Sequence, residues 1–270
     1  MKKKGWLFVD VVAPVVLYSL VLFATQFVVI LVMTLIFFAS HTGGEVGNIT
    51  DAAINFLKSK SLLIYVLGSA LTLGVIFVDS KIRKVKFSEY TQLHKPIGVD
   101  GAVSAVLCGM SFSLWLSVML STLPIPESWL SDYAEASSGL DETSFLAIIA
   151  IGVIGPIVEE IVFRGIIYKH LSVCMPEYLA LVLQAVIFAS LHGDTVIWVS
   201  YAFLGGLLFG YIRMLTGSVR TTILSHMAFN LIGYVVDLLG EGMIMLLIAA
   251  SPIILILSVR YMYKKSVKTE

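Results

Sequence analysis

Two adjacent carboxylates and one arginine are the most unusual feature of this sequence. Glu159 and Glu160 interrupt a run that is otherwise apolar from Phe145, and Arg164 follows four residues after Glu160. On a helix this spacing places Glu160 and Arg164 one turn apart on the same side, in the favoured acid-before-base order, while Glu159 points roughly 100° away. An ionisable side chain in hydrocarbon costs about 2.5–3.5 kcal/mol. Such a cluster must therefore be paired, line a wet cavity, or take part in chemistry.

Two histidines and one asparagine follow on later apolar stretches. His192 ends an apolar stretch, four residues after Phe188. His226 precedes Asn230 by four residues, so that these two share one helical face. A carboxylate in a partly dry cavity suits a general base, and a histidine beside it can share a water molecule. A second histidine and an asparagine can donate hydrogen bonds to a developing oxyanion. This is the equipment for peptide hydrolysis by an activated water.

The same side chains are compatible with a second mechanism and with purely structural roles. Two histidines and one glutamate plus water form a known catalytic zinc site, which here would use Glu159, His192 and His226. The residues leave zinc-dependent and metal-free hydrolysis open. No serine or cysteine stands in a recognisable nucleophile setting, which argues against an acyl-enzyme. The acid–base cluster could instead only fix helix packing, and the histidines and asparagine could only bond neighbouring helices.

The composition places these residues in a membrane. The chain is 58% hydrophobic and 13% charged, with a mean hydropathy of +0.95, whereas soluble domains contain about 25% charged residues. We therefore predict an all-α, polytopic membrane helix bundle of about eight transmembrane helices. The apolar stretches near the spanning length of about 20 residues are 10–39, 62–78, 101–123, 145–171, 178–192, 195–214, 219–239 and 243–263.

The basic residues define a topology for these spans. Sixteen of the eighteen Lys and Arg residues fall in the N-terminus, the tail and alternate connections, including the 79–100 connection. In the other connections, which include 40–61 and 124–144, the only basic residues are Lys58 and Lys60. We expect these connections to be loops. Because Lys and Arg collect on the cytoplasmic side, we predict that both termini are cytoplasmic. The two cysteines, Cys108 and Cys174, suggest neither a disulfide framework nor a cysteine-based metal site.

The fifth stretch is short and ends at His192-Gly193-Asp194, which predicts a turn within membrane depth beside a cavity. Counted from Phe145, Glu159 lies about 21 Å from the outer face, which leaves about 10 Å to the inner face. His226, counted from Val219, is about 10 Å from the inner face. His192, counted from Tyr178, comes out about 21 Å from it. Either the fifth helix starts outside the hydrocarbon core or the segment is displaced.

Three ordered motifs resemble one known family. Glu159-Glu160-x-x-x-Arg164, Phe188-x-x-x-His192 and His226-x-x-x-Asn230 are similar to the motifs of the CPBP family, the CAAX-protease and bacteriocin-processing intramembrane proteases, also called the Abi family. The resemblance covers about residues 142–240. The family includes the endopeptidase that removes the last three residues of prenylated CAAX proteins, and bacterial members linked to peptide processing, bacteriocin immunity and surface signalling.

The resemblance implies a role for each residue. Glu159 would activate the water with help from His192, and Glu160 and Arg164 would support the site. His226 and Asn230 would hold the oxyanion. The family is commonly labelled metalloprotease but is also argued to be a metal-free glutamate protease, so that the cofactor is either zinc or none. The resemblance also favours a bacterial plasma membrane as the location.

These inferences give one functional hypothesis and two alternatives. We expect an intramembrane endopeptidase that cleaves a peptide or protein with a membrane-associated segment, in contact with the lipid bilayer and without a nucleic-acid partner. A non-enzymatic immunity or signalling-partner protein is the first alternative, and a transporter or proton relay the second. The predicted units are the N-terminal transmembrane helices of unassigned role (1–140), the catalytic core (141–240), and the last helix with its basic tail (241–270).

Overall fold

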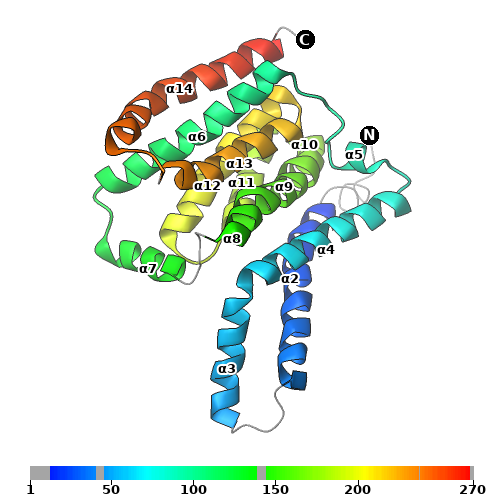
Figure 1. The fold of residues 1–270 in the computed structure, drawn as a ribbon. Helices are drawn as coiled ribbons and strands as arrows, with labels where there is room; N and C mark the ends of the chain where they lie inside the picture. Colours follow the sequence, from blue (N-terminus) through cyan, green and yellow to red (C-terminus); the bar gives the residue numbers. More distant parts are fainter. Residues whose placement is uncertain (1–12, 41–45, 139–143, 237, 268–270) are drawn as a thin grey trace.

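The computed structural model describes residues 13–40, 46–138, 144–236 and 238–267, and this part of the chain is helical without strands (Figure 1). All eight predicted stretches fall on helices, which confirms the all-α bundle; residues 10–12 and Asp237 lie outside the described residues. The helices on these stretches are α2 (Ala13–Ser40), α4 (Ser61–Ile82), α6 (Val99–Thr122), the continuous segment α8 (Phe145–Ile149), η2 (Ala150–Ile154), α9 (Gly155–Glu160), η3 (Ile161–Ile167) and α10 (Tyr168–Cys174), then α11 (Glu177–Ser190), α12 (Val196–Thr216), α13 (Val219–Val236) and α14 (Glu241–Val267).

Six of these eight segments are long and apolar enough to cross a membrane, counted over the described residues. The remaining two are α11, with 14 residues, and α13, with 18. α11 is shorter than the bilayer core requires, and α13 carries Arg220, Ser225, His226 and Asn230 among its apolar residues. The chain is thus a multi-pass membrane protein. The two segments that fall short are the ones that supply histidines and the asparagine.

Two connections that we expected to be loops contain helices. The 40–61 connection holds α3 (Val46–Ser59), and the 124–144 connection holds α7 (Glu127–Ser138). A one-turn helix, α5 (Phe87–Tyr90), lies in the 79–100 connection. The prediction of loops was wrong because it used charge and the length of apolar runs. α3 has an apolar and a polar face, and this pattern favours a helix that lies along an interface.

The helices pack around the segment that carries the carboxylates. Buried side chains of η3, such as Val162, Ile166 and Ile167, form the centre of the largest hydrophobic cluster, to which α2, α4, α10, α11 and α12 contribute. α6 packs against both α13 and α14, and α11 packs against α12. α2 and α3 form a hairpin that extends away from the rest of the bundle (Figure 1). α2 contacts η3, and α4 contacts α9 and η2. The α2–α4 pair therefore meets the core along the segment that carries the carboxylates.

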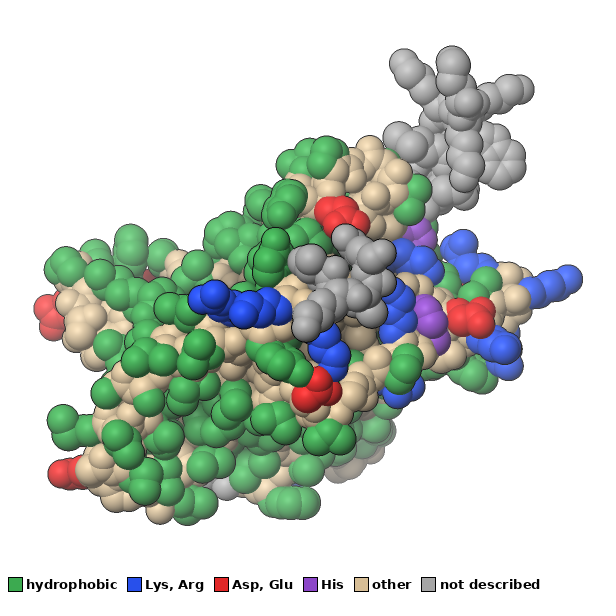
Figure 2. All heavy atoms as spheres, turned by 90° about the horizontal axis from the view of Figure 1, so that it is seen from above, with side chains coloured by type: hydrophobic (Ala, Val, Ile, Leu, Met, Phe, Trp, Pro, Cys, Tyr) green, Lys and Arg blue, Asp and Glu red, His purple; other side chains and the backbone are tan. Residues whose placement is uncertain are grey.

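Basic side chains are numerous on one face of the molecule. Figure 2 shows Lys and Arg from the middle to one side of the face seen from above. Exposed basic residues on the 79–100 connection and on α14 are Lys81, Arg83, Lys84, Lys86, Lys95, Arg260, Lys264 and Lys265. This grouping is the pattern that the positive-inside rule describes for a cytoplasmic face.

Gly109 on α6 gives a first test of how closely the helices approach. A Cβ added there would lie 1.9 Å from the backbone oxygen of Ser225, the residue before His226 on α13. We expect Gly109→Ala to push α13 away and to lower the free energy of unfolding by about 1–3 kcal/mol, measured by denaturant unfolding in detergent. Gly101→Ala on the same helix is the matched control, since nothing lies within 4 Å of its added Cβ. Equal stability of the two variants would contradict the close approach.

Candidate active site

The helix that carries both carboxylates is widened before it reaches them. Pro156 lacks a backbone N–H and cannot continue the ordinary hydrogen-bond ladder. The preceding turn, η2, is a π-helix in which the Gly155 N–H donates to Ala150 O. In this register the Ile151 carbonyl would need the nitrogen of Pro156 as its donor, which has no hydrogen. The side chain of Asn230 satisfies that carbonyl instead, with 2.8 Å between Asn230 Nδ2 and Ile151 O.

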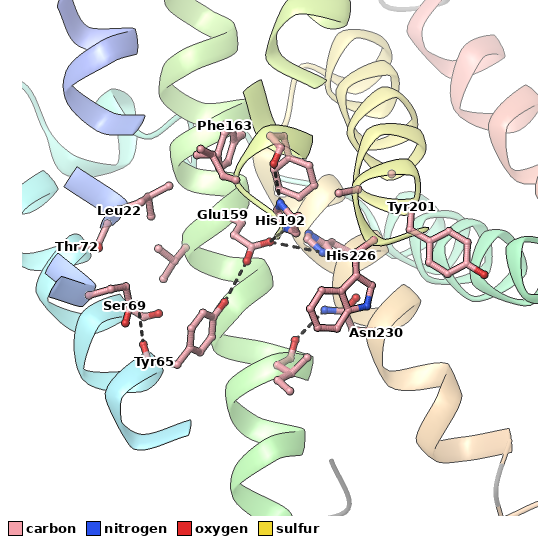
Figure 3. A pocket seen from close by; sticks show the side chains of 18 of the residues that line it. Leu22, Tyr65, Ser69, Thr72, Glu159, Phe163, His192, Tyr201, His226 and Asn230 are labelled. Atoms are coloured by element: carbon pink, nitrogen blue, oxygen red, sulfur yellow. Dashed lines mark hydrogen bonds and ion pairs between the residues drawn. The ribbon is translucent and has the colours of Figure 1, made fainter. Parts of the chain in front are cut away.

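Glu159 faces a cavity and is surrounded by three side chains from other helices (Figure 3). The Tyr65 hydroxyl on α4 donates to Glu159 Oε1 at 3.0 Å. Glu159 Oε2 lies 3.7 Å from His192 Nε2 and 3.8 Å from His226 Nε2. The Glu159 side chain is 20% exposed, so that it can reach a solvent or substrate molecule. The two oxygens of this carboxylate therefore have different surroundings.

Glu160 lies behind Glu159 and is completely buried together with Arg164. Glu160 Oε1 accepts hydrogen bonds from Arg164 Nη1 at 2.8 Å and from His226 Nδ1 at 2.9 Å. Arg164 also donates to Gly206 O on α12 at 3.3 Å, and its guanidinium lies over the Phe188 ring, 4.4 Å from the ring centroid. The predicted pairing of Glu160 with Arg164 is confirmed. This pair joins η3 to α11, α12 and α13.

Both histidines are held in one orientation by a bond at Nδ1. The His226 Nδ1–H donates to Glu160, and the His192 Nδ1–H donates to Phe188 O at 2.6 Å. Because an oxygen that only accepts fixes the proton on Nδ1, each ring turns Nε2 toward Glu159 Oε2. After His192 the chain turns at Gly193, whose φ of +103° is a conformation that other residues rarely adopt. The predicted break at His192 is therefore a turn that aims the imidazole into the site.

The cavity in front of Glu159 has a volume of about 670 Å³. Its lining comes from α2, α4, the η2–α9–η3 segment, the end of α11, α12 and α13, and is mainly apolar and aromatic. The side chains that line it include Leu22, Phe23, Gln26, Leu62, Tyr65, Ser69, Thr72, Phe163, Phe188, Trp198, Tyr201, Phe209 and Phe229. A space of this size and character suits an organic ligand or a short peptide segment.

The structure brings all six predicted residues into one region but in two layers. Glu159, His192, His226 and Asn230 line the cavity, whereas Glu160 and Arg164 stand behind it without exposed surface. Sequence reasoning missed Tyr65. Its signal was present as a row of polar side chains, Tyr65, Ser69 and Thr72, at the i, i+4, i+7 positions of one face of the second apolar stretch.

The arrangement of possible ligands bears on the zinc hypothesis. Glu159, His192 and His226 are the three side chains proposed to bind zinc. Among the residues that the structure describes, no group of three His, Cys, Asp or Glu side chains is placed to hold a metal ion. Cys108 and Cys174 are free. Glu159 Oε2 nonetheless lies 3.7 Å from His192 Nε2 and 3.8 Å from His226 Nε2, and the choice between zinc and no metal stays a prediction.

One family model matches the part of the chain that carries the site. It is described as type II CAAX prenyl endopeptidase Rce1-like and matches residues 141–232. This segment is similar to the CAAX-protease family. No curated protein and no solved structure matches the chain. The CAAX-protease match includes all six predicted site residues, while Tyr65 on α4 lies outside it.

The buried pair behind the CAAX-protease site is expected to dominate local stability. Replacing Arg164 with Leu leaves the Glu160 carboxylate without its cation in a dry interior, which costs about 3–5 kcal/mol. Denaturant unfolding of the variant in detergent measures this loss. Lys265→Leu removes the partner of Asp100 at a half-exposed pair and should change stability far less. A loss at Arg164 no greater than that at Lys265 would show that the buried pair does not stabilise the core.

Proposed function

We propose that this protein is an intramembrane endopeptidase of the CAAX-protease type that hydrolyses membrane-associated peptides with a water activated by Glu159 and His192. The observation that carries this proposal is the position of Glu159 Oε2, within 4 Å of His192 Nε2 and His226 Nε2 at the wall of the cavity. The polar groups closest to Glu159 are two imidazoles and a phenol, which can exchange protons with a water, and no serine or cysteine is hydrogen-bonded to His192 or His226 within the described residues.

The separation between Glu159 and His192 leaves room for the reacting water. A distance of 3.7 Å is too long for a direct hydrogen bond and suits a bridging molecule. A water there donates one hydrogen to Glu159 Oε2 and the other to His192 Nε2, which directs its lone pair toward the substrate carbonyl. As the C–O bond forms, Glu159 takes the proton. When the C–N bond breaks, the same proton passes to the leaving amine.

His226 and Asn230 are placed to stabilise the oxyanion. One Asn230 Nδ2 hydrogen is held by Ile151 O, which fixes the amide and leaves the second hydrogen available to the cavity. His226 can donate to the oxyanion only through Nε2–H, because its Nδ1–H is held by Glu160. Fixed donors of this kind cost little reorganisation when charge develops, which is why they accelerate acyl transfer.

The cavity and the surface indicate the class of substrate. Its apolar and aromatic lining favours an uncharged, hydrophobic segment, such as the end of a membrane-associated protein. We place the face that carries the basic residues (Figure 2) in the cytoplasm, in keeping with the prediction from the basic residues of the sequence that both termini are cytoplasmic. The substrate then has a segment embedded in the membrane, and a prenylated CAAX-type peptide belongs to the class to be tested.

Glu159→Gln should abolish peptide cleavage while the protein remains folded. Loss of the general base predicts a decrease in kcat of at least about 10²–10⁴-fold. The measurement is cleavage of a panel of membrane peptides, including a prenylated CAAX-type peptide, by the purified protein in detergent.

Glu241→Gln, the same change at an exposed carboxylate at the start of α14, is the matched control and should cleave like the unchanged protein. Cleavage by Glu159→Gln at the unchanged rate would refute the glutamate mechanism. If Glu159→Ala also retained the cellular phenotype, a non-enzymatic immunity or signalling role would be favoured.

We further propose that hydrolysis is metal-independent. In the mechanism above Glu159 and His192 activate the water, and no step needs a metal ion. Cleavage should therefore persist after dialysis against a strong chelator. Loss of cleavage on chelation, with recovery on addition of zinc, would refute this proposal and establish a zinc-dependent reaction.

A further inference from the structure

Tyr65 approaches the proposed general base from outside the CAAX-protease match. It lies on α4, and its phenol points at Glu159 across the boundary between the α2–α4 pair and the core (Figure 3). The hydroxyl donates to Glu159 Oε1 at 3.0 Å, on the oxygen that does not face the histidines. The two oxygens of Glu159 are thus divided between a tyrosine on one side and two imidazoles on the other.

The neighbouring residues leave space for this contact. Gly155 lies one turn before Glu159, and a Cβ added to it would be 2.5 Å from the Tyr65 hydroxyl oxygen. On α2, the side-chain amide of Gln26 donates to the backbone oxygen of Tyr65 at 3.4 Å. Gln26 itself fits because the facing residue on α4 is Gly68, where a Cβ would be 2.4 Å from the amide. Glycines on two helices therefore permit the approach of Tyr65 to Glu159.

We propose that Tyr65 is a positioning residue that orients the Glu159 carboxylate for water activation, an inference that rests on the proposed endopeptidase function. The terminal torsion of a glutamate is broad and weakly fixed by its own rotamer preferences. A hydrogen bond at Oε1 holds the plane of the carboxylate. Oε2 is then kept between His192 and His226, where the water must be deprotonated.

This assignment gives the N-terminal helices a part in the reaction. The sequence left the role of residues 1–140 unassigned, and the family match begins at residue 141. With Tyr65 included, the reacting carboxylate depends on α4 and, through Gln26, on α2. The matched segment alone therefore lacks one of the three groups that surround Glu159.

The first test is Tyr65→Phe in the full-length protein, assayed on a peptide that the unchanged protein cleaves. The substitution keeps the ring and removes the hydrogen bond to a charged oxygen, for which we expect kcat to fall about 10–100-fold with KM changed less than about threefold. Tyr18→Phe is the matched control. It removes another buried tyrosine hydroxyl from the α2–α4 pair, one that donates to Asp79, about 21 Å along α4 from Tyr65. Its kcat should be unchanged.

The second test approaches the same contact from the other side. Gly155→Ala places a methyl group against the Tyr65 hydroxyl and should lower kcat by a similar factor. In the Tyr65→Phe background that methyl group has no hydroxyl to displace. Gly155→Ala should therefore cause little additional loss there, so that the two changes are strongly non-additive.

The outcomes separate this inference from the function on which it rests. If Glu159→Gln abolishes cleavage but Tyr65→Phe retains kcat within twofold, the endopeptidase mechanism stands and the role of Tyr65 is refuted. Equal decreases in kcat for Tyr65→Phe and Tyr18→Phe, or additive effects of Gly155→Ala and Tyr65→Phe, would reduce Tyr65 to a packing residue. Cleavage that does not require Glu159 would refute both proposals.

Discussion

The carboxylate of Glu160 is the group on which the rest of the site depends. A completely buried charge must be paired and hydrogen-bonded, because its desolvation costs several kcal/mol. Oε1 of Glu160 is paired with Arg164 on its own helix and with His226 on α13, whereas Oε2 has no hydrogen-bond partner among the described residues. Arg164 in turn needs an acceptor and finds Gly206 O on α12. One buried charge thus determines how three helices are registered, and it fixes the His226 ring that faces Glu159 on the other side.

A second constraint comes from the backbone. Within a membrane every unpaired carbonyl is costly, so a proline in the middle of a spanning helix requires a substitute donor. Pro156 creates that need at Ile151, and Asn230 meets it. The π-helical turn at Ile151, η2, precedes the two carboxylates, and a second π-helical turn, η3, follows them. Irregular turns of this kind are frequent at functional sites, and here the defect in the ladder is what holds a polar amide at the cavity wall.

The sequence predicted the eight helices and the pairing of Glu160 with Arg164, because apolar length and a spacing of four are local properties. The depth of His192 in the membrane could not be found by counting residues from Tyr178, because Tyr178 was only assumed to lie at the inner face. The carboxylate-bearing segment, Phe145–Cys174, has 30 residues and a length of about 45 Å, longer than the hydrocarbon core. This excess length favours the alternative in which the fifth helix starts outside the core, and the depth of His192 stays a prediction. Tyr65 was missed because the polar row on α4 does not reveal which distant helix it faces.

The α2–α4 pair combines two tasks that are separate in many enzymes. Leu22, Phe23 and Gln26 of α2 and Tyr65, Ser69 and Thr72 of α4 form one wall of the cavity, and Tyr65 is bonded to the carboxylate on the opposite wall. The side chains that shape this side of the cavity and the hydroxyl that holds Glu159 Oε1 therefore belong to the same pair of helices. A change in how α2 and α4 pack would alter the space and the carboxylate contact together, which couples the N-terminal helices to the site although the matched segment begins only at residue 141.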